Sequence, residues 1–403
     1  MAVPADILRT AVERYLDLHA HPELSGAEHR TAGLFAAWLT AEECSVTTGI
    51  GGHGVAGVLR NGDGPTVLLR AELDALPVTE RTGLPYASTV RGVMHACGHD
   101  LHLAALAAAV TLLARERDSW SGTLVALGQP AEESLTGARA VLTDGLYERV
   151  PVPDVVLAQH CAPIAAGTVA HARGPLLAGS RTLEVVLHGR GGHAGAPQLT
   201  VDPVVAAAAV VTRLQAVVAR ETDPAEQAVL TVGRLHAGDQ PNVVPDDAEL
   251  GITLRAFTED ALDRLTAAVE RVVRAESEAS ACPTPPEVTV TGSSPVLMAD
   301  GATARAVFAA QAAHFGAARM RDWPGGMATE DFPLLGAAGA GLHGRSGIRS
   351  VYWMLGTASS AGVAAVPAPV PGNHSPEYAP DVRTALPTGI EALAAAARAL
   401  LPA

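Results

Sequence analysis

Residues 94–127 read MHACGHDLHLAALAAAVTLLARERDSWSGTLVAL, and they decide the fold class. The run from Leu101 to Ala114 is almost entirely apolar, which is typical of a helix buried on all sides. The small and apolar residues from Gly122 to Leu127 predict a strand soon after it. A buried helix followed by a buried strand is a repeating unit of α/β sheets that carry helices on their faces.

The first third of the chain repeats this alternation. Apolar residues at helical spacing predict helices at 7–18 and 27–40, and short apolar runs predict strands at 54–59, 66–69 and 155–158. We therefore expect an α/β domain with a mostly parallel sheet and covering helices.

The middle of the chain has a different pattern. Residues 182–188 alternate apolar and polar side chains, as a half-exposed strand does. Long helices are expected at 203–220 and 260–276, with strands at 228–235 and 249–256 between them. This order predicts a small open sheet with helices on one face, which is an α+β domain.

The α+β segment is expected to be an insertion, because the strand–helix alternation resumes after a proline-rich stretch at 282–286. The expected boundaries are 1–179 and 292–403 for the two parts of the main domain. The inserted domain, with a role as lid or in dimerisation, is expected at 180–291.

The composition excludes several kinds of function. The formal net charge is −14, whereas nucleic-acid binding needs clustered basic residues, so we expect no nucleic-acid partner. The chain contains no lysine. Schiff-base chemistry, pyridoxal phosphate and a P-loop all need that side chain, so these are excluded as well.

The remaining composition predicts a cytoplasmic protein without a membrane partner. The four cysteines are scattered, as in proteins from a reducing compartment. The N-terminus lacks the basic and apolar regions of a signal peptide. The apolar run Leu101–Leu113 is shorter than the ~20 residues that a membrane span needs.

The segment from His95 to His102 contains one thiol and three imidazoles immediately before the predicted buried helix. Cys97 and His99 are two residues apart, so both side chains can approach the same small ion cluster from a loop. A reduced cysteine among surface histidines is the alternative, and the density of ligand types argues against it.

Three further segments carry ligand-type side chains. Glu132 and Glu133 follow the strand predicted at 122–127, and ligands bind at strand ends in α/β folds. One of two adjacent carboxylates can bind a metal while the other carries a proton. His160 and His374 precede proline-containing turns. Taken alone, the two glutamates favour a solvated acidic turn and each histidine a structural role.

Taken together, these motifs resemble the M20 metallopeptidases, in particular the amidohydrolase branch with hippurate, N-acyl-amino-acid and indoleacetyl-amino-acid hydrolases. The resemblance extends over essentially the whole chain. Its motifs, in chain order, are LRAELDALP (69–77), HACGHDLH (95–102), QPAEE (129–133), the turn at His160, GRGGHAGAP (189–197), NVVPD (242–246), EDF (330–332) and NHSP (373–376).

The resemblance implies a binuclear metal-dependent amidohydrolase that cleaves small N-acyl amino acids or related conjugates. The implied cofactors are two divalent ions, Zn first and Mn, Co or Ni as alternatives. Glu132 would be the general base, and Asp74 would orient an imidazole ligand. The implied metal ligands are Cys97, His99, Glu133, His160 and His374.

The resemblance also implies roles for the inserted domain. His193 would reach the active site of the partner subunit in a homodimer and stabilise the oxyanion. Asn242 and Arg255 would contact the carboxylate of the substrate. The expected partner is therefore a small N-acyl amino acid.

Some positions depart from the common family pattern, and three other functions stay open. Glu72 stands where Asp is usual, Gln198 where His is frequent, and His53 and Cys161 are unusual at their positions. None of these removes a ligand or the base. The open alternatives are a dipeptidase or carboxypeptidase, a dedicated deacylase of a biosynthetic pathway, and an idle relative that only binds small molecules.

Overall fold

The computed structural model describes residues 2–359 and 370–402, and these form two compact units. One unit is inserted into the sequence of the other. Unit 1 comprises Met1–Leu176, Met298–Pro324 and Asp331–Ala403, and unit 2 comprises Leu177–Leu297 and Gly325–Glu330.

Unit 1 contains an eight-stranded sheet in the order β1-β2-β4-β3-β5-β16-β6-β15. The central strands β4, β3, β5 and β16 run parallel. The strands β1 and β2 join one side antiparallel, and the parallel pair β6 and β15 joins the other. The predicted mostly parallel α/β sheet is confirmed. The strands are β1 (Ser45–Ile50), β2 (Gly54–Asn61), β3 (Thr66–Glu72), β4 (Gly122–Gln129), β5 (Val155–Ala165), β6 (Val169–Ala172), β15 (Met320–Trp323) and β16 (Arg349–Ala358).

Both faces of this sheet are buried. In β3, Val67 and Leu69 belong to the same core cluster as α1, α3 and α11, whereas Leu68 points the other way and is equally buried. This pattern is typical of a sheet with helices on both sides. The helices of unit 1 are α1 (Ala5–Ala20), α2 (His29–Ala41), α3 (His99–Arg115), α4 (Gly137–Thr143), α5 (Leu146–Arg149), α8 (Gly301–Phe315), α9 (Ala340–His343) and α11 (Val382–Leu400).

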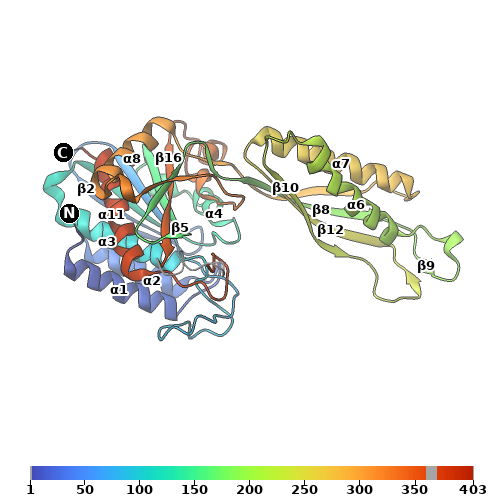
Figure 1. Ribbon diagram of the computed structural model, residues 1–403, viewed down its shortest axis with the longest axis horizontal. Helices are drawn as coiled ribbons and strands as arrows, with labels where there is room; N and C mark the ends of the chain where they lie inside the picture. Colours follow the sequence, from blue (N-terminus) through green and yellow to red (C-terminus); the bar gives the residue numbers. More distant parts are fainter. Residues whose placement is uncertain (1, 360–369, 403) are drawn as a thin grey trace. The chain divides into compact units, whose positions relative to one another are not determined.

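Helix α3 is the central helix of unit 1, with α1 and α11 packed against it (Figure 1). It begins at His99, two residues before the start predicted from the apolar run. The reason is Gly98, whose φ of 85° lets the loop turn directly into the helix. The helix start therefore carries His99 and His102 on its first turn.

Unit 2 contains a four-stranded antiparallel sheet in the order β10-β12-β8-β13, with α6 and α7 packed on one face (Figure 1). Alternate residues of β8, such as Leu183, Val185 and Leu187, are buried under these helices. Two short strand pairs, β9 with β11 and β7 with β14, complete the topology. The elements of unit 2 are β8 (Gly179–His188), β9 (Gly192–His193), α6 (Pro203–Glu221), β10 (Ala228–His236), β11 (Val243–Val244), β12 (Asp247–Ala256), α7 (Glu259–Ala279) and β13 (Glu287–Ser294). β7 (Pro175–Leu177) and β14 (Leu297–Met298) lie where the chain passes from one unit to the other.

Helix α6 is, among the described residues, the one helix long and apolar enough to cross a membrane. One side of this helix nevertheless packs against the sheet of unit 2. Ala206, Val210, Leu214 and Val217 are buried in the core between this helix and the sheet. Burial in the core of unit 2 accounts for a third of the apolar window of this helix.

Candidate metal centre

Ligand-type side chains of three neighbouring parallel strands of unit 1 lie at or near the same edge of the sheet. Asp74 lies two residues beyond β3, Glu132 and Glu133 follow β4, and His160 lies inside β5. The carboxyl ends of parallel strands are where α/β sheets bind ligands.

Cys97, just before α3, and His99, the first residue of α3, join this edge. Sγ of Cys97 lies 3.4 Å from Nε2 of His160. Nε2 of His99 lies 3.7 Å from a carboxylate oxygen of Glu132 and 3.8 Å from one of Glu133. Folding thus brings together side chains from three separate segments.

His374 completes the cluster from the C-terminal part of the chain. Its Nε2 lies 3.4 Å from Oε2 of Glu133, and its side chain is 56% exposed. Its backbone has a φ of 67° and donates a hydrogen bond to the carbonyl of Ala96. The side-chain amide of Asn373 donates to the carbonyls of Cys97 and Cys161, at 3.1 and 3.2 Å. These bonds fix the segment around His374 against the loops that carry the other ligands.

The cluster fits metal ions. Its donor atoms fall into overlapping groups of three, each within 4.8 Å: Cys97, His99 and His160; Cys97, Glu133 and His374; His99, Glu132 and Glu133. Because these groups share members, they form one continuous cluster. Sulfur, imidazole and carboxylate are together the donors of Zn and similar divalent ions.

Two buried atoms of the cluster support this interpretation. Among the described residues, neither Nε2 of His99 nor Oε1 of Glu133 has a hydrogen-bond partner. A buried polar atom without a partner costs about 1–3 kcal/mol. Burial also raises the pKa of the Cys97 thiol to about 12, so a thiolate there needs a cation beside it. A cation would satisfy all three groups.

Asp74 orients the ligands around it. Its Oδ2 accepts hydrogen bonds from Oγ of Ser25 at 2.7 Å and from the N–H of Glu133 at 2.9 Å. Nδ1 of His99 lies 2.9 Å from the carbonyl of Asp74 and 3.4 Å from Oδ1. Burial works against the charge of Asp74, but the bonds from His99, Ser25 and Glu133 outweigh it and lower the pKa. The bonds at Nδ1 of His99 leave Nε2 directed at the cluster.

Glu132 is buried at the edge of the cluster, with its side chain 7% exposed. The loop that carries it has two non-glycine residues with positive φ, Ala131 at 52° and Leu135 at 55°. Such conformations concentrate at functional sites, where surrounding contacts hold them.

The other predicted site residues lie in unit 2. His193 is exposed in β9, where its Nδ1 accepts from the N–H of Gly195. The carbonyl of Asn242 accepts from the N–H of Ala194, so His193 and Asn242 lie on neighbouring segments. Arg255 lies half-buried in β12, and burial lowers the pKa of its guanidinium.

A model of the peptidase family described as M20/M25/M40 matches residues 68–399. That span is most of the chain, and it includes every residue predicted above as ligand or base. The chain belongs to peptidase family M20. The resemblance recognised in the motifs is therefore confirmed.

Relatives of this M20 chain include hydrolases of N-acylated amino acids. It is 39% identical to an N-acetylcysteine deacetylase of Bacillus subtilis over 64% of this chain and 67% of that protein. It is 38% identical to an IAA-amino acid hydrolase of Arabidopsis thaliana over 69% and 63%. The aligned part thus spans about two thirds of these relatives. A solved dinuclear metal-binding peptidase of the M20 family from Bacillus subtilis superposes with a TM-score of 0.79, at 29% identity over 99% of each chain.

A buried network of Arg70, Glu72 and His102 lies behind the ligands of this M20 chain, and the pairing of these side chains was not predicted from the sequence. Nδ1 of His102 lies 2.7 Å from Oε2 of Glu72, whose other oxygen accepts from Arg70. Nε2 of His102 accepts from the N–H of Cys161 at 2.9 Å, next to His160. The sequence did contain a signal for this network, because Arg70 and Glu72 are charged residues within the otherwise apolar segment LLRAEL (68–73). Charged side chains in a buried strand need partners.

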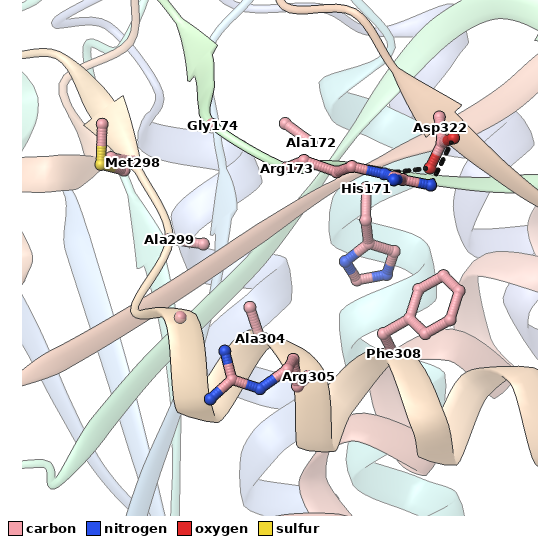
Figure 2. Close-up of a pocket in the computed structure, with 11 residues that line it drawn as sticks. His171, Ala172, Arg173, Gly174, Met298, Ala299, Ala304, Arg305, Phe308 and Asp322 are labelled. Carbon is pink, nitrogen blue, oxygen red and sulfur yellow. Dashed lines mark hydrogen bonds and ion pairs between the residues drawn. The ribbon is translucent and has the colours of Figure 1, made fainter.

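A hollow of about 710 Å³ lies elsewhere in unit 1, between β6, β15 and the start of α8 (Figure 2). The imidazole of His171 points into it, Met298 and Phe308 line it, and an ion pair joins Arg173 to Asp322 across one side. None of the predicted ligands lines this hollow. It is therefore separate from the metal centre.

Proposed function

We propose that this M20 protein hydrolyses the amide bond of small N-acyl amino acids or related conjugates, with two divalent metal ions and with Glu132 as general base. The convergence of ligand-type side chains around Glu132 at one sheet edge carries the proposal. The names of the relatives, a deacetylase and an amino acid hydrolase, support the substrate class. The dinuclear neighbour supports two metal ions. The proposed ligands are Cys97, His99, Glu133, His160 and His374.

The residues of the chain suggest how the reaction proceeds. Divalent ions in the cluster would supply polarisation of the amide carbonyl and acidification of water. Glu132 takes the proton from the attacking water and returns it to the leaving nitrogen. Asp74 keeps Nε2 of His99 directed at the cluster, and the low exposure of Glu132 limits competing solvent.

Unit 2 provides the remaining proposed roles. His193 donates to the oxyanion from the partner subunit of a homodimer, since its side chain is exposed and free to reach another chain. Asn242 and Arg255 bind the substrate carboxylate, for which a guanidinium is well suited. Residues 180–291 then form the lid and dimerisation domain, and residues 1–179 and 292–403 form the catalytic domain.

We further propose Zn as the resident ion, because thiolate and imidazole donors suit it, with Mn, Co or Ni as substitutes. A cytoplasmic location fits four free cysteines, three of which are buried. The net charge of −14 fits a small-molecule partner better than nucleic acid.

The test is amide hydrolysis by protein loaded separately with Zn, Mn and Co, on N-acetyl, N-benzoyl and longer N-acyl amino acids. Chelator-sensitive release of the free amino acid is expected. Glu132→Gln should lower kcat by at least about 1000-fold, since it removes the base, while bound metal stays at the wild-type level. A Glu132→Gln protein with wild-type kcat would remove Glu132 from the role of base.

A peptidase is the second candidate, because the dinuclear neighbour is named a peptidase. Dipeptides in the same panel separate the two: a higher kcat/KM on dipeptides would replace the deacylase proposal. Metal bound without hydrolysis of any panel compound would contradict both. An idle binding protein or a dedicated biosynthetic deacylase would then remain.

A further inference from the structure

The proposed base, Glu132, is flanked by two backbone hydrogen bonds to carboxylates. The N–H of Ala131 donates to Oε1 of Glu28 at 2.8 Å. The N–H of Glu133 donates to Oδ2 of Asp74 at 2.9 Å. The N–H groups of the residues before and after Glu132 are thus each held by a buried acid from another part of the chain.

One turn at the start of α2 organises both acids. Oγ of Ser25 donates to Oδ2 of Asp74 at 2.7 Å, and the N–H of Gly26 donates to Oε1 of Glu28 at 2.9 Å. We call residues 25–28 the clamp turn. It connects to the loop of Glu132 on both sides, directly through Glu28 and indirectly through Asp74.

The backbone at Ala131 needs such support. Its φ of 52° lies in the left-handed region, which residues with a Cβ seldom adopt. Its carbonyl accepts from the N–H of Gly137 at 3.1 Å, and its N–H is held by Glu28. Both ends of the strained residue are therefore fixed, which is the condition under which strain persists at a functional site.

The side chain of Glu28 serves this loop and not its own helix. Glu28 is the N-cap of α2 but makes no side-chain capping bond there. The carboxylate of Glu23 performs that task, accepting from the N–H groups of Arg30 and Thr31 at 3.0 and 2.8 Å. Glu28 is fully buried, and among the residues described its Oε2 has no hydrogen-bond partner.

Burying this acid is costly, and the helix does not explain it. Burial raises the pKa of Glu28, although the N–H groups of Gly26 and Ala131 partly oppose that shift. The buried carboxylate of Glu28 maintains the hydrogen bond to Ala131, in the loop that carries the proposed base.

We propose that Glu28 is a positioning residue for the proposed base: it holds the peptide of Ala131 so that the carboxylate of Glu132 faces the metal centre. This rests on the proposed function, in which Glu132 moves the proton. Loss of the bond lets Ala131 relax to a negative φ and displaces Glu132. A displacement of about 1 Å in a catalytic group costs on the order of 100-fold in rate.

The test compares Glu28→Ala, Glu28→Gln and the control Glu23→Ala. Glu28→Ala should lower kcat by about 10–100-fold, with KM and bound metal unchanged. Glu28→Gln should stay within about threefold of wild type, because its amide oxygen accepts the same two N–H groups. Glu23→Ala removes the side-chain cap of the same helix, so it should lower the melting temperature and leave kcat unchanged.

A second measurement does not depend on activity. Amide hydrogen exchange of the peptide that contains residues 129–136 should accelerate in Glu28→Ala and stay at the wild-type rate in Glu28→Gln and Glu23→Ala. Unchanged exchange and unchanged kcat in Glu28→Ala would overturn the proposal, as would a Gln variant as impaired as the Ala variant. If the wild type hydrolyses no panel compound, the proposed function fails, and the exchange measurement still decides whether Glu28 holds the loop.

Discussion

Gly98 lies in a confined space between two proposed ligands of the metal centre. Its φ is 85°, and a Cβ there would lie 3.0 Å from both Sγ of Cys161 and the hydroxyl of Tyr378. The residue stands between Cys97 and His99, so any shift of its backbone moves two proposed ligands.

Replacing this glycine tests that constraint. Gly98→Ala should destabilise the protein by about 2–4 kcal/mol, through left-handed strain and overpacking together. Gly83→Ala is the matched control, because Gly83 has a φ of 71° but nothing within 4 Å of its Cβ position. It should cost only the strain, about 1–2 kcal/mol. Urea denaturation measures both, and equal losses would show that the contacts around Gly98 are unimportant.

The residue scale also shows what a sequence can predict about a site. The ligand types of Cys97 and His99 stood out, because few structural roles need such a density of thiol and imidazole. Glu133 taken alone favoured a solvated acidic turn, and only the family resemblance implied it as a ligand. Glu28 was not recognisable, because its partner Ala131 lies 103 positions away and contributes only a backbone N–H. Roles that depend on a backbone partner far along the chain leave no local pattern.

At the scale of elements, His102 joins helix α3 to strands β3 and β5. Its Nδ1 bonds to Glu72 at the end of β3, and its Nε2 accepts from Cys161 in β5. The neighbouring residue in β5 is the proposed ligand His160. The hydrogen bond to Cys161 therefore joins the helix to the strand directly beside that proposed ligand.

Removing this connection gives a prediction for the elements. His102→Phe should leave the buried N–H of Cys161 unpaired, at a cost of about 1–3 kcal/mol, and lower metal affinity by about 10–100-fold. His171→Phe is the control, because His171 also makes a buried hydrogen bond, to Gln311, but lies outside the cluster. Competition with a chelator measures affinity, and a similar affinity loss in both variants would argue against a specific role of His102.

Several long elements were predicted by residue range, whereas α8, α11, β16 and the short strands were not. The apolar runs of α3, β3 and β4 exceed what a loop tolerates, so their existence followed from the sequence. Strands β6 (Val169–Ala172) and β15 (Met320–Trp323) have four residues each. A segment this short is too brief for a hydrophobic pattern that would distinguish a strand from a turn. The two strands pair with each other although they lie about 150 residues apart in the sequence, so their pairing depends on the fold of the whole unit.

At the scale of the whole molecule, the proposed catalytic groups are divided between the two units. Unit 1 carries Glu132 and the proposed ligands, and unit 2 carries His193, Asn242 and Arg255. The sequence indicated this division through the change from an α/β to an α+β pattern. Which subunit supplies His193 is a property of the assembly and leaves no pattern in the chain.

Complementation tests the proposed assembly. Glu132→Gln and His193→Ala should each be inactive as pure proteins. If His193 acts across a homodimer, subunit exchange between them creates one intact site in each mixed dimer, so activity should return to about one quarter of wild type. No recovery despite demonstrated exchange would mean that His193 acts within its own subunit or not at all.

The most direct test of the central claim is the number of metal ions bound per chain, measured by elemental analysis after loading with Zn and removal of free metal. We predict two ions per chain in the wild type, two in Glu132→Gln and fewer than two in Glu133→Ala. Chelation should abolish hydrolysis, and added metal should restore it. A wild-type protein that binds no ion, or that hydrolyses its substrate equally well after chelation, would contradict the account.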